Sequence, residues 1–129
     1  DEACGEANLD IQYIMGVAQN VNTTFYYTDD WMFGWITSVA DLASPSDVYS
    51  ISYGGPEAGL SPSFTSTFNM EALKLGVMGV TIVASSGDEG APGSFASYNL
   101  SYCGYMAQFP ASSPYVTAVG ASNVCIFFF

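Results

Sequence analysis

The spacing of apolar residues along the chain predicts alternating helices and strands. Three segments place apolar side chains at helical spacing, namely residues 5–18, residues 31–42 and the segment that begins at Ser61 and ends at Gly76 to Gly79. Four shorter segments, rich in β-branched or aromatic residues, predict strands at 21–28, 47–53, 80–84 and 115–119. A long Gly/Ser/Tyr-rich loop is expected between residues 85 and 113.

This order of elements predicts the fold class. Strands that alternate with helices form parallel sheets with right-handed crossovers, and helices then cover both faces of the sheet. We therefore expect an α/β fold of three layers. The sequence shows no internal repeat and no linker that would divide it into two domains.

Local signals support two of the helices. Asp29 and Asp30 are capping-type residues ahead of the segment 31–42, and Ser61 followed by Pro62 is typical of a helix start. The third helix is expected to bury one stripe of side chains, Phe64, Phe68, Ala72 and Leu75.

Composition and charge narrow the function classes. The chain has 129 residues, half of them hydrophobic, which is enough for a globular domain with a core. Twelve acidic residues face one cation, Lys74, without any Arg or His, so a nucleic-acid surface is excluded and binding to anionic membranes is disfavoured. Self-repulsion would fall as carboxylates protonate, which favours an acidic working compartment, although an acidic surface also serves solubility alone.

Cysteines, sequons and the end of the chain add weaker signals. Cys4, Cys103 and Cys125 are odd in number and do not have zinc-site spacing, so at least one thiol is free or pairs outside the chain. The glycosylation sequons at Asn22 and Asn99 fit a secretory protein. There is no apolar run of membrane length, and the apolar tail 123–129 is unusual for a soluble domain. We expect residues 1–122 to be part of a domain and 123–129 to be an atypical tail left by truncation.

Glu6 and Asp10 are the first candidates for chemistry. On a helical wheel both lie on the side of that segment's apolar residues, and their spacing of four brings the two side chains within reach of each other. Two neighbouring carboxylates repel, so one tends to keep a proton that both share. A helix dipole would account for an acid at Glu6 in the first turn, but not for Asp10 deeper in the helix.

Asp88 is the second candidate, because ligands of open parallel sheets bind at the carboxyl ends of the strands. It follows the strand 80–84 in the sequence Ser-Ser-Gly-Asp-Glu-Gly. The same sequence is also favourable for a turn in which the Asp bonds its own backbone. Without His, neither a Ser-His-Asp triad nor a Cys-His pair can form from this chain, so any proton acceptor must be a carboxylate.

Four segments together resemble the sedolisin family of serine-carboxyl peptidases, which includes the tripeptidyl peptidases. They are residues 5–13 (GEANLDIQY), 48–54 (VYSISYG), 79–91 (GVTIVASSGDEGA) and 109–120 (FPASSPYVTAVG). They occur in the family's order from Gly5 to Ala121, and the resemblance stops after Ser122.

The resemblance implies a subtilisin-like fold, incomplete in this chain, and hydrolysis of peptide or protein substrates at acidic pH by a secreted or lysosomal/vacuolar protein. It implies that Glu6 takes the proton from a nucleophilic serine, that Asp10 supports Glu6, and that Asp88 belongs to the oxyanion hole. A protonated carboxyl group donates a hydrogen bond to an oxyanion, and it loses that ability once ionised. Ser52, Tyr53 and Gly54 would line the substrate cleft.

The chain also departs from the family pattern. The family's nucleophile lies in a Ser-Gly-Thr-Ser-type segment, which this sequence lacks, and the calcium loop expected in the full-length protein is also absent from it. We therefore expect the chain to be inactive alone. A second hypothesis is a catalytically dead homologue that acts as a peptide-binding or interaction module. Glycoside hydrolysis is disfavoured because its two acids flank the scissile bond, whereas Glu6 and Asp10 share one helical face. The sequence indicates no oligomeric state.

Overall fold

The computed structural model describes residues 2–99, 101 and 104–122. The larger elements are α1 (Glu2–Val17), α2 (Trp31–Ala40), β1 (Val48–Ile51), α3 (Pro62–Val77), β3 (Thr81–Ser85) and β5 (Thr117–Val119). The shorter elements are β2 (Gly55–Pro56), the 3-10 turn η1 (Glu57–Gly59), α4 (Ser94–Tyr98) and β4 (Gln108–Phe109).

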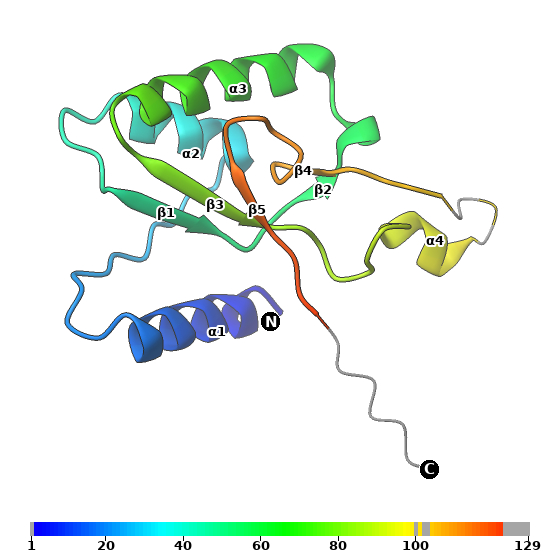
Figure 1. The fold of residues 1–129 in the computed structure, drawn as a ribbon, viewed down its shortest axis with the longest axis horizontal. Helices are drawn as coiled ribbons and strands as arrows, with labels where there is room; N and C mark the ends of the chain where they lie inside the picture. Colours follow the sequence, from blue (N-terminus) through cyan, green and yellow to red (C-terminus); the bar gives the residue numbers. More distant parts are fainter. Residues whose placement is uncertain (1, 100, 102–103, 123–129) are drawn as a thin grey trace.

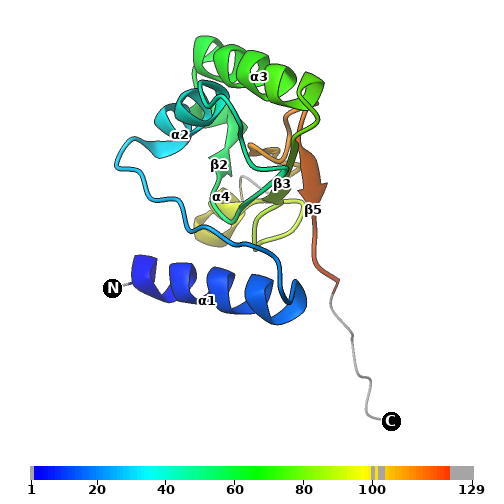
Figure 2. The ribbon, with the colours of Figure 1, turned by 90° about the vertical axis from the view of Figure 1, so that its left-hand side faces the viewer.

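The sheet is parallel, as the sequence predicts. Its strands follow the order β1-β3-β5, with Ile51 of β1 beside Ala84 of β3 and Ala84 beside Ala118 of β5. Helices α2 and α3 cover one face, and α1 lies on the opposite side of the sheet (Figures 1 and 2). The fold is thus α/β with three layers, and a small antiparallel pair of β2 and β4 lies beside the main sheet.

The core lies between the sheet and the α2/α3 layer. The buried stripe of α3 consists of Phe68, Ala72 and Leu75, as predicted, while Phe64 is only half-buried. It packs with the buried side chains Met32, Ile36 and Val39 of α2, Ile82 of β3 and Phe109 of β4. Phe109 comes from the predicted loop, and its ring meets Phe68 edge-on with centroids 4.8 Å apart.

The two predicted helix starts differ in detail. The hydroxyl of Ser61 accepts a hydrogen bond from the backbone N–H of Phe64, and Pro62 opens α3. Asp30 occupies the cap position of α2, but its side chain makes no capping bond. The predicted start at Ser61 is confirmed, and α2 also begins directly after Asp30 as predicted, although Asp30 does not cap it through its side chain.

Two further predictions require correction. Residues 21–28 do not form a strand, because β-propensity yields a strand only where a ladder partner and a buried face are available. The exposed side chains of Val21, Phe25 and Tyr27 show that this segment has no such face here. In addition, the predicted loop 85–113 contains α4 and β4. Phe109 of β4 is buried in the core, a tertiary contact that the local sequence does not reveal.

The cysteines and the glycosylation sequons lie on the surface or outside the described residues. Cys4 is free and exposed, while Cys103, Cys125 and the tail 123–129 lie outside the described residues. The sequon residues Asn22 and Asn99 are both exposed.

Among the described residues, no helix is both long and apolar enough to cross a membrane.

The core assignment predicts a large effect at Phe68. Its ring is fully buried, so truncation to Ala removes the contact with Phe109 and leaves a cavity. We expect Phe68→Ala to lower the free energy of unfolding of the chain by about 3–5 kcal/mol. Met70, 54 % exposed on the same helix, provides the control, and Met70→Ala should change it by less than about 0.5 kcal/mol. Equal effects of the two substitutions in urea unfolding would contradict this core.

Candidate active site

The carboxyl ends of β1 and β3 form the edge at which the candidate residues meet. Because Ile51 lies beside Ala84, these two strands end at the same level of the sheet. Ser52 follows directly after β1, and Asp88 lies three residues beyond the end of β3. Both candidate segments therefore leave the sheet at the edge where ligands of parallel sheets bind.

A hydrogen bond places Asp10 at this edge. The hydroxyl of Ser52 donates to Oδ1 of Asp10 over 2.8 Å, and it joins residues 42 positions apart in the chain. The bond is partly buried, so it is less open to competition from water than a surface contact. It attaches α1 to the end of β1.

Glu6 lies one turn before Asp10 on α1, and its side chain is half-buried. The spacing of four places the two acids on the same helical face, as predicted. The apolar residues around them remain exposed, with Tyr13 at 70 % and Val17 at 87 %. Within the described part of the chain, the Glu6 carboxyl makes no hydrogen bond or ion pair, so it is available to another group.

Asp88 sits in an exposed loop whose backbone requires glycine. Gly87 and Gly90 flank the Asp88-Glu89 pair, and their φ angles of 93° and 67° lie in the left-handed region. The alternative in which Asp88 bonds its own backbone is not realised, because among residues 2–99, 101 and 104–122 its carboxyl group has no hydrogen-bond partner. The loop therefore presents a carboxyl group that is exposed to solvent.

The segment after β1 offers an unpaired backbone. Tyr53 and Gly54 lie beyond the strand, and in the described structure their backbone groups make no backbone hydrogen bonds. The chain then pairs again where Gly55 of β2 lies beside Phe109 of β4. A Cβ atom added at Gly54 would be 2.6 Å from the Phe109 carbonyl oxygen, so only glycine fits between the two backbones.

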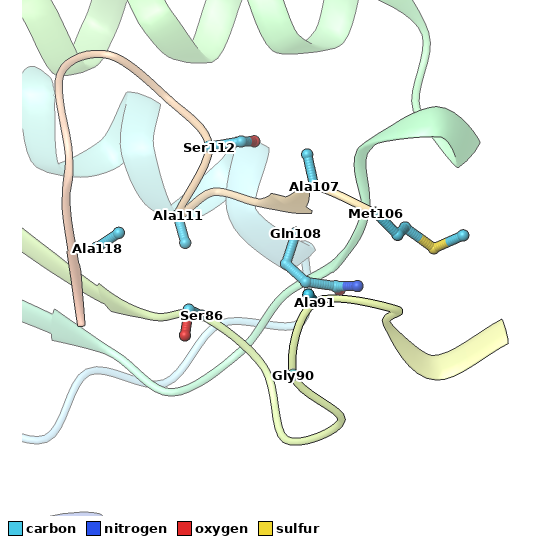
Figure 3. Close-up of a pocket in the computed structure, with 9 residues that line it drawn as sticks. All are labelled: Ser86, Gly90, Ala91, Met106, Ala107, Gln108, Ala111, Ser112 and Ala118. Carbon is cyan, nitrogen blue, oxygen red and sulfur yellow. The ribbon is translucent and has the colours of Figure 1, made fainter. Parts of the chain in front are cut away.

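A hollow of about 380 Å³ adjoins the Asp88 loop (Figure 3). Its walls come from the two ends of that loop, from β4 and its neighbours, and from β5, and include Ser86, Ala91, Met106, Gln108 and Ala118. In Figure 3 the Gln108 side chain points toward the loop that carries Gly90 and Ala91. Its buried Nε2 has no hydrogen-bond partner among the described residues.

The single cation of the sequence does not lie at this edge. Lys74, the single cation of the sequence, pairs with Glu71 on α3 at 2.6 Å, on the other side of the sheet from α1. Across the described ranges, no group of three or more His, Cys, Asp or Glu side chains is arranged to hold a metal ion. Away from this edge, a hydrogen bond to Asp29 and the negative charge of that residue raise the pKa of Tyr27.

Sequence reasoning missed two features of the site. The side-chain bond of Ser52 to Asp10 connects segments whose distance in space depends on the whole fold. Gln108 and Met106 belong to the predicted loop, and no local pattern shows that they wall a hollow. The only available signal was the placement of Ser52 at a strand end.

Comparison with known proteins shows that the chain is homologous to the sedolisin family of serine-carboxyl peptidases. Physarolisin of Physarum polycephalum is 34% identical over 129 residues, which cover 91% of this chain. Human tripeptidyl-peptidase 1 is 33% identical over 124 residues, which cover 92% of it. The chain spans 22% of the length of each of these relatives.

No protein-family model matches the sequence. Among solved structures, Pseudomonas sedolisin, a serine-carboxyl proteinase in complex with pseudo-iodotyrostatin, aligns with a TM-score of 0.46 at 30% identity. That alignment covers 57% of this chain and 20% of the sedolisin chain.

The tight contact at Gly54 yields a prediction. Gly54→Ala forces a methyl group against the Phe109 carbonyl and should lower the free energy of unfolding of the chain by about 1–3 kcal/mol. The control is Gly55→Ala, since a Cβ there meets no other atom within 4 Å, and it should cost far less. Thermal unfolding followed by circular dichroism compares the two, and a neutral Gly54→Ala would mean that the segment after β1 does not approach Phe109.

Proposed function

We propose that the complete protein containing residues 1–129 is an acid-active serine-type peptidase, acting as an endopeptidase or a tripeptidyl peptidase. Glu6 is its general base, Asp10 supports Glu6, and Asp88 stabilises the oxyanion. The observation that carries this proposal is the placement of Asp10 at the carboxyl edge of the sheet by its bond to Ser52. Asp88 follows the neighbouring strand at the same edge. The homology to peptidases over nine tenths of the chain supports the same conclusion.

The proposed chemistry uses carboxyl groups in place of histidine. A serine hydroxyl attacks the carbonyl carbon of the scissile peptide and gives its proton to Glu6. The π electrons of the carbonyl move to its oxygen, and protonated Asp88 donates a hydrogen bond to that oxyanion. When the intermediate collapses, the C–N bond breaks and Glu6 returns the proton to the leaving amine. Water then hydrolyses the acyl-enzyme by the same steps.

The substrate would bind along the segment after β1. An extended peptide pairs with free backbone groups by adding a strand, and the backbone of Tyr53 and Gly54 is unpaired in the described structure. Ser52 belongs to the same edge, and the neighbouring hollow beside Asp88 has room for a substrate side chain. This arrangement presents the peptide to both proposed catalytic segments.

The nucleophile must come from outside residues 1–129, since this sequence contains no Ser-Gly-Thr-Ser segment. We therefore expect the 129-residue chain to be inactive by itself, and we expect calcium to be bound by other parts of the complete protein. The acidic composition and the exposed sequon asparagines favour a secreted or lysosomal/vacuolar compartment. If the complete protein also lacks a nucleophilic serine, the same unpaired edge would serve a peptide-binding module instead.

Substitution of the proposed catalytic acids in the complete protein tests this function. Asp88→Ala removes the oxyanion donor and should lower kcat by about 10²–10³-fold. Glu6→Gln removes the base and should lower kcat by about 10²–10⁴-fold. Both are measured with a fluorogenic peptide at acidic pH.

Glu89→Gln is the matched control, because Glu89 is exposed in the same loop as Asp88 and has no proposed role. Its kcat should stay close to that of the unsubstituted protein. Near-normal turnover in Asp88→Ala or Glu6→Gln would remove the corresponding residue from the mechanism.

A further inference from the structure

The Ser52 side chain makes a hydrogen bond that substrate binding at the cleft edge does not need. Pairing of a peptide with this segment needs only backbone groups. The Ser52 hydroxyl instead donates a hydrogen bond to Oδ1 of Asp10, at 2.8 Å. A side-chain role of Ser52 at Asp10 is therefore distinct from a role of this segment's backbone in binding substrate, and substitution of the side chain tests the first role alone.

The position of Ser52 relative to the sheet is well fixed. It follows directly after Ile51, which is held in register against Ala84 of the central strand β3. Its serine side chain is short and half-buried, so its hydroxyl has little freedom relative to the sheet. A donor fixed in this way determines where its acceptor lies.

Helix α1 has little else to fix its position. Leu9, Tyr13 and Val17 are between 50 % and 87 % exposed, so apolar packing does not determine how the helix sits on the sheet. Among the side-chain hydrogen bonds of the described residues, the Ser52 bond is the one that connects α1 to the segment directly after β1. Loss of that bond would leave both the rotation of α1 and the side-chain torsion of Asp10 free to vary.

The bond also distinguishes the two oxygens of the Asp10 carboxyl group. Oδ1 accepts from Ser52, which leaves Oδ2 for another donor. Glu6 lies one turn earlier on the same face and is the nearest proposed functional group along the helix. If Glu6 carries the proton taken from the nucleophile, its O–H can be donated to Oδ2 of an Asp10 that is already held in place.

We propose that Ser52 is a positioning residue of the carboxyl pair, which fixes Asp10 through its side chain and, through Asp10, aligns Glu6 with the nucleophile. This inference rests on the proposed function and adds to it a residue that has so far been placed only in substrate binding. Ser52 does not touch the reacting atoms. Its loss should therefore reduce turnover and leave the affinity for substrate almost unchanged.

The test compares Ser52→Val with Ser52→Thr in the complete protein, since these two side chains have the same shape and differ in the hydroxyl group. Ser52→Val should lower kcat by about ten- to a hundredfold, with KM within about twofold of the original value. Ser52→Thr keeps a donor and should retain most of the turnover. Ser50→Ala, in β1 two residues before Ser52, is the control and should leave both constants unchanged.

A double-substitution cycle with Asp10→Ala shows whether Ser52 acts through Asp10. Once the acceptor is gone, adding Ser52→Val should cause no further loss of kcat, whereas independent effects would multiply. Multiplying effects, equal turnover of the Val and Thr variants, or a rise in KM alone would each overturn the proposal. Thermal unfolding of both variants serves as a check on their folding. If Ser52→Val and Ser52→Thr both lose structure and turnover to the same extent, the positioning role of the Ser52 hydroxyl is contradicted.

The outcomes also separate this inference from the proposed function. If Glu6→Gln and Asp10→Ala abolish turnover while Ser52→Val is normal, the inference fails and the peptidase assignment stands. If Glu6→Gln is fully active, the proposed mechanism fails, and the role of Ser52 fails with it.

Discussion

The burial of Phe109 against α3 is the constraint on which the remaining architecture depends. Its ring is 1 % exposed and packs edge-on against Phe68 and Phe64, with centroid distances of 4.8 and 5.9 Å. The backbone around Phe109 pairs with Gly55 and approaches Gly54 so closely that a side chain there would collide with it. One buried ring thereby holds the segment after β1 in place and, through Gln108, the wall of the hollow beside the Asp88 loop.

The other half of the site depends on a polar interaction. Apolar burial fixes the sheet and its α2/α3 layer, but the exposed stripe of α1 shows that this helix is not held in the same way. The bond from Ser52 to Asp10 provides the missing specificity, because hydrogen bonds are directional and apolar contacts are not. A catalytic acid on α1 would therefore owe its position to the sheet edge.

Sequence patterns predicted the features that local chemistry determines. The apolar stripe of α3, its start at Ser61 and Pro62, and the parallel direction of the strands all follow from periodicity and propensity. The strand predicted at 21–28 failed because its propensity has no ladder to join. The sequence could not predict that Gln108 lines the hollow or that Ser52 bonds Asp10, because both features result from contacts between distant parts of the chain. The roles of the six candidate site residues stay predictions.

The central claim is that carboxyl groups from α1 and from the loop after β3 form one acid-dependent catalytic centre. The most direct measurement is kcat/KM of the complete protein for a peptide substrate as a function of pH. A protonated carboxyl group in the oxyanion hole donates a hydrogen bond only until it ionises, so the account predicts activity in acid that is lost as the pH rises toward neutral. Undiminished hydrolysis at neutral pH would contradict it.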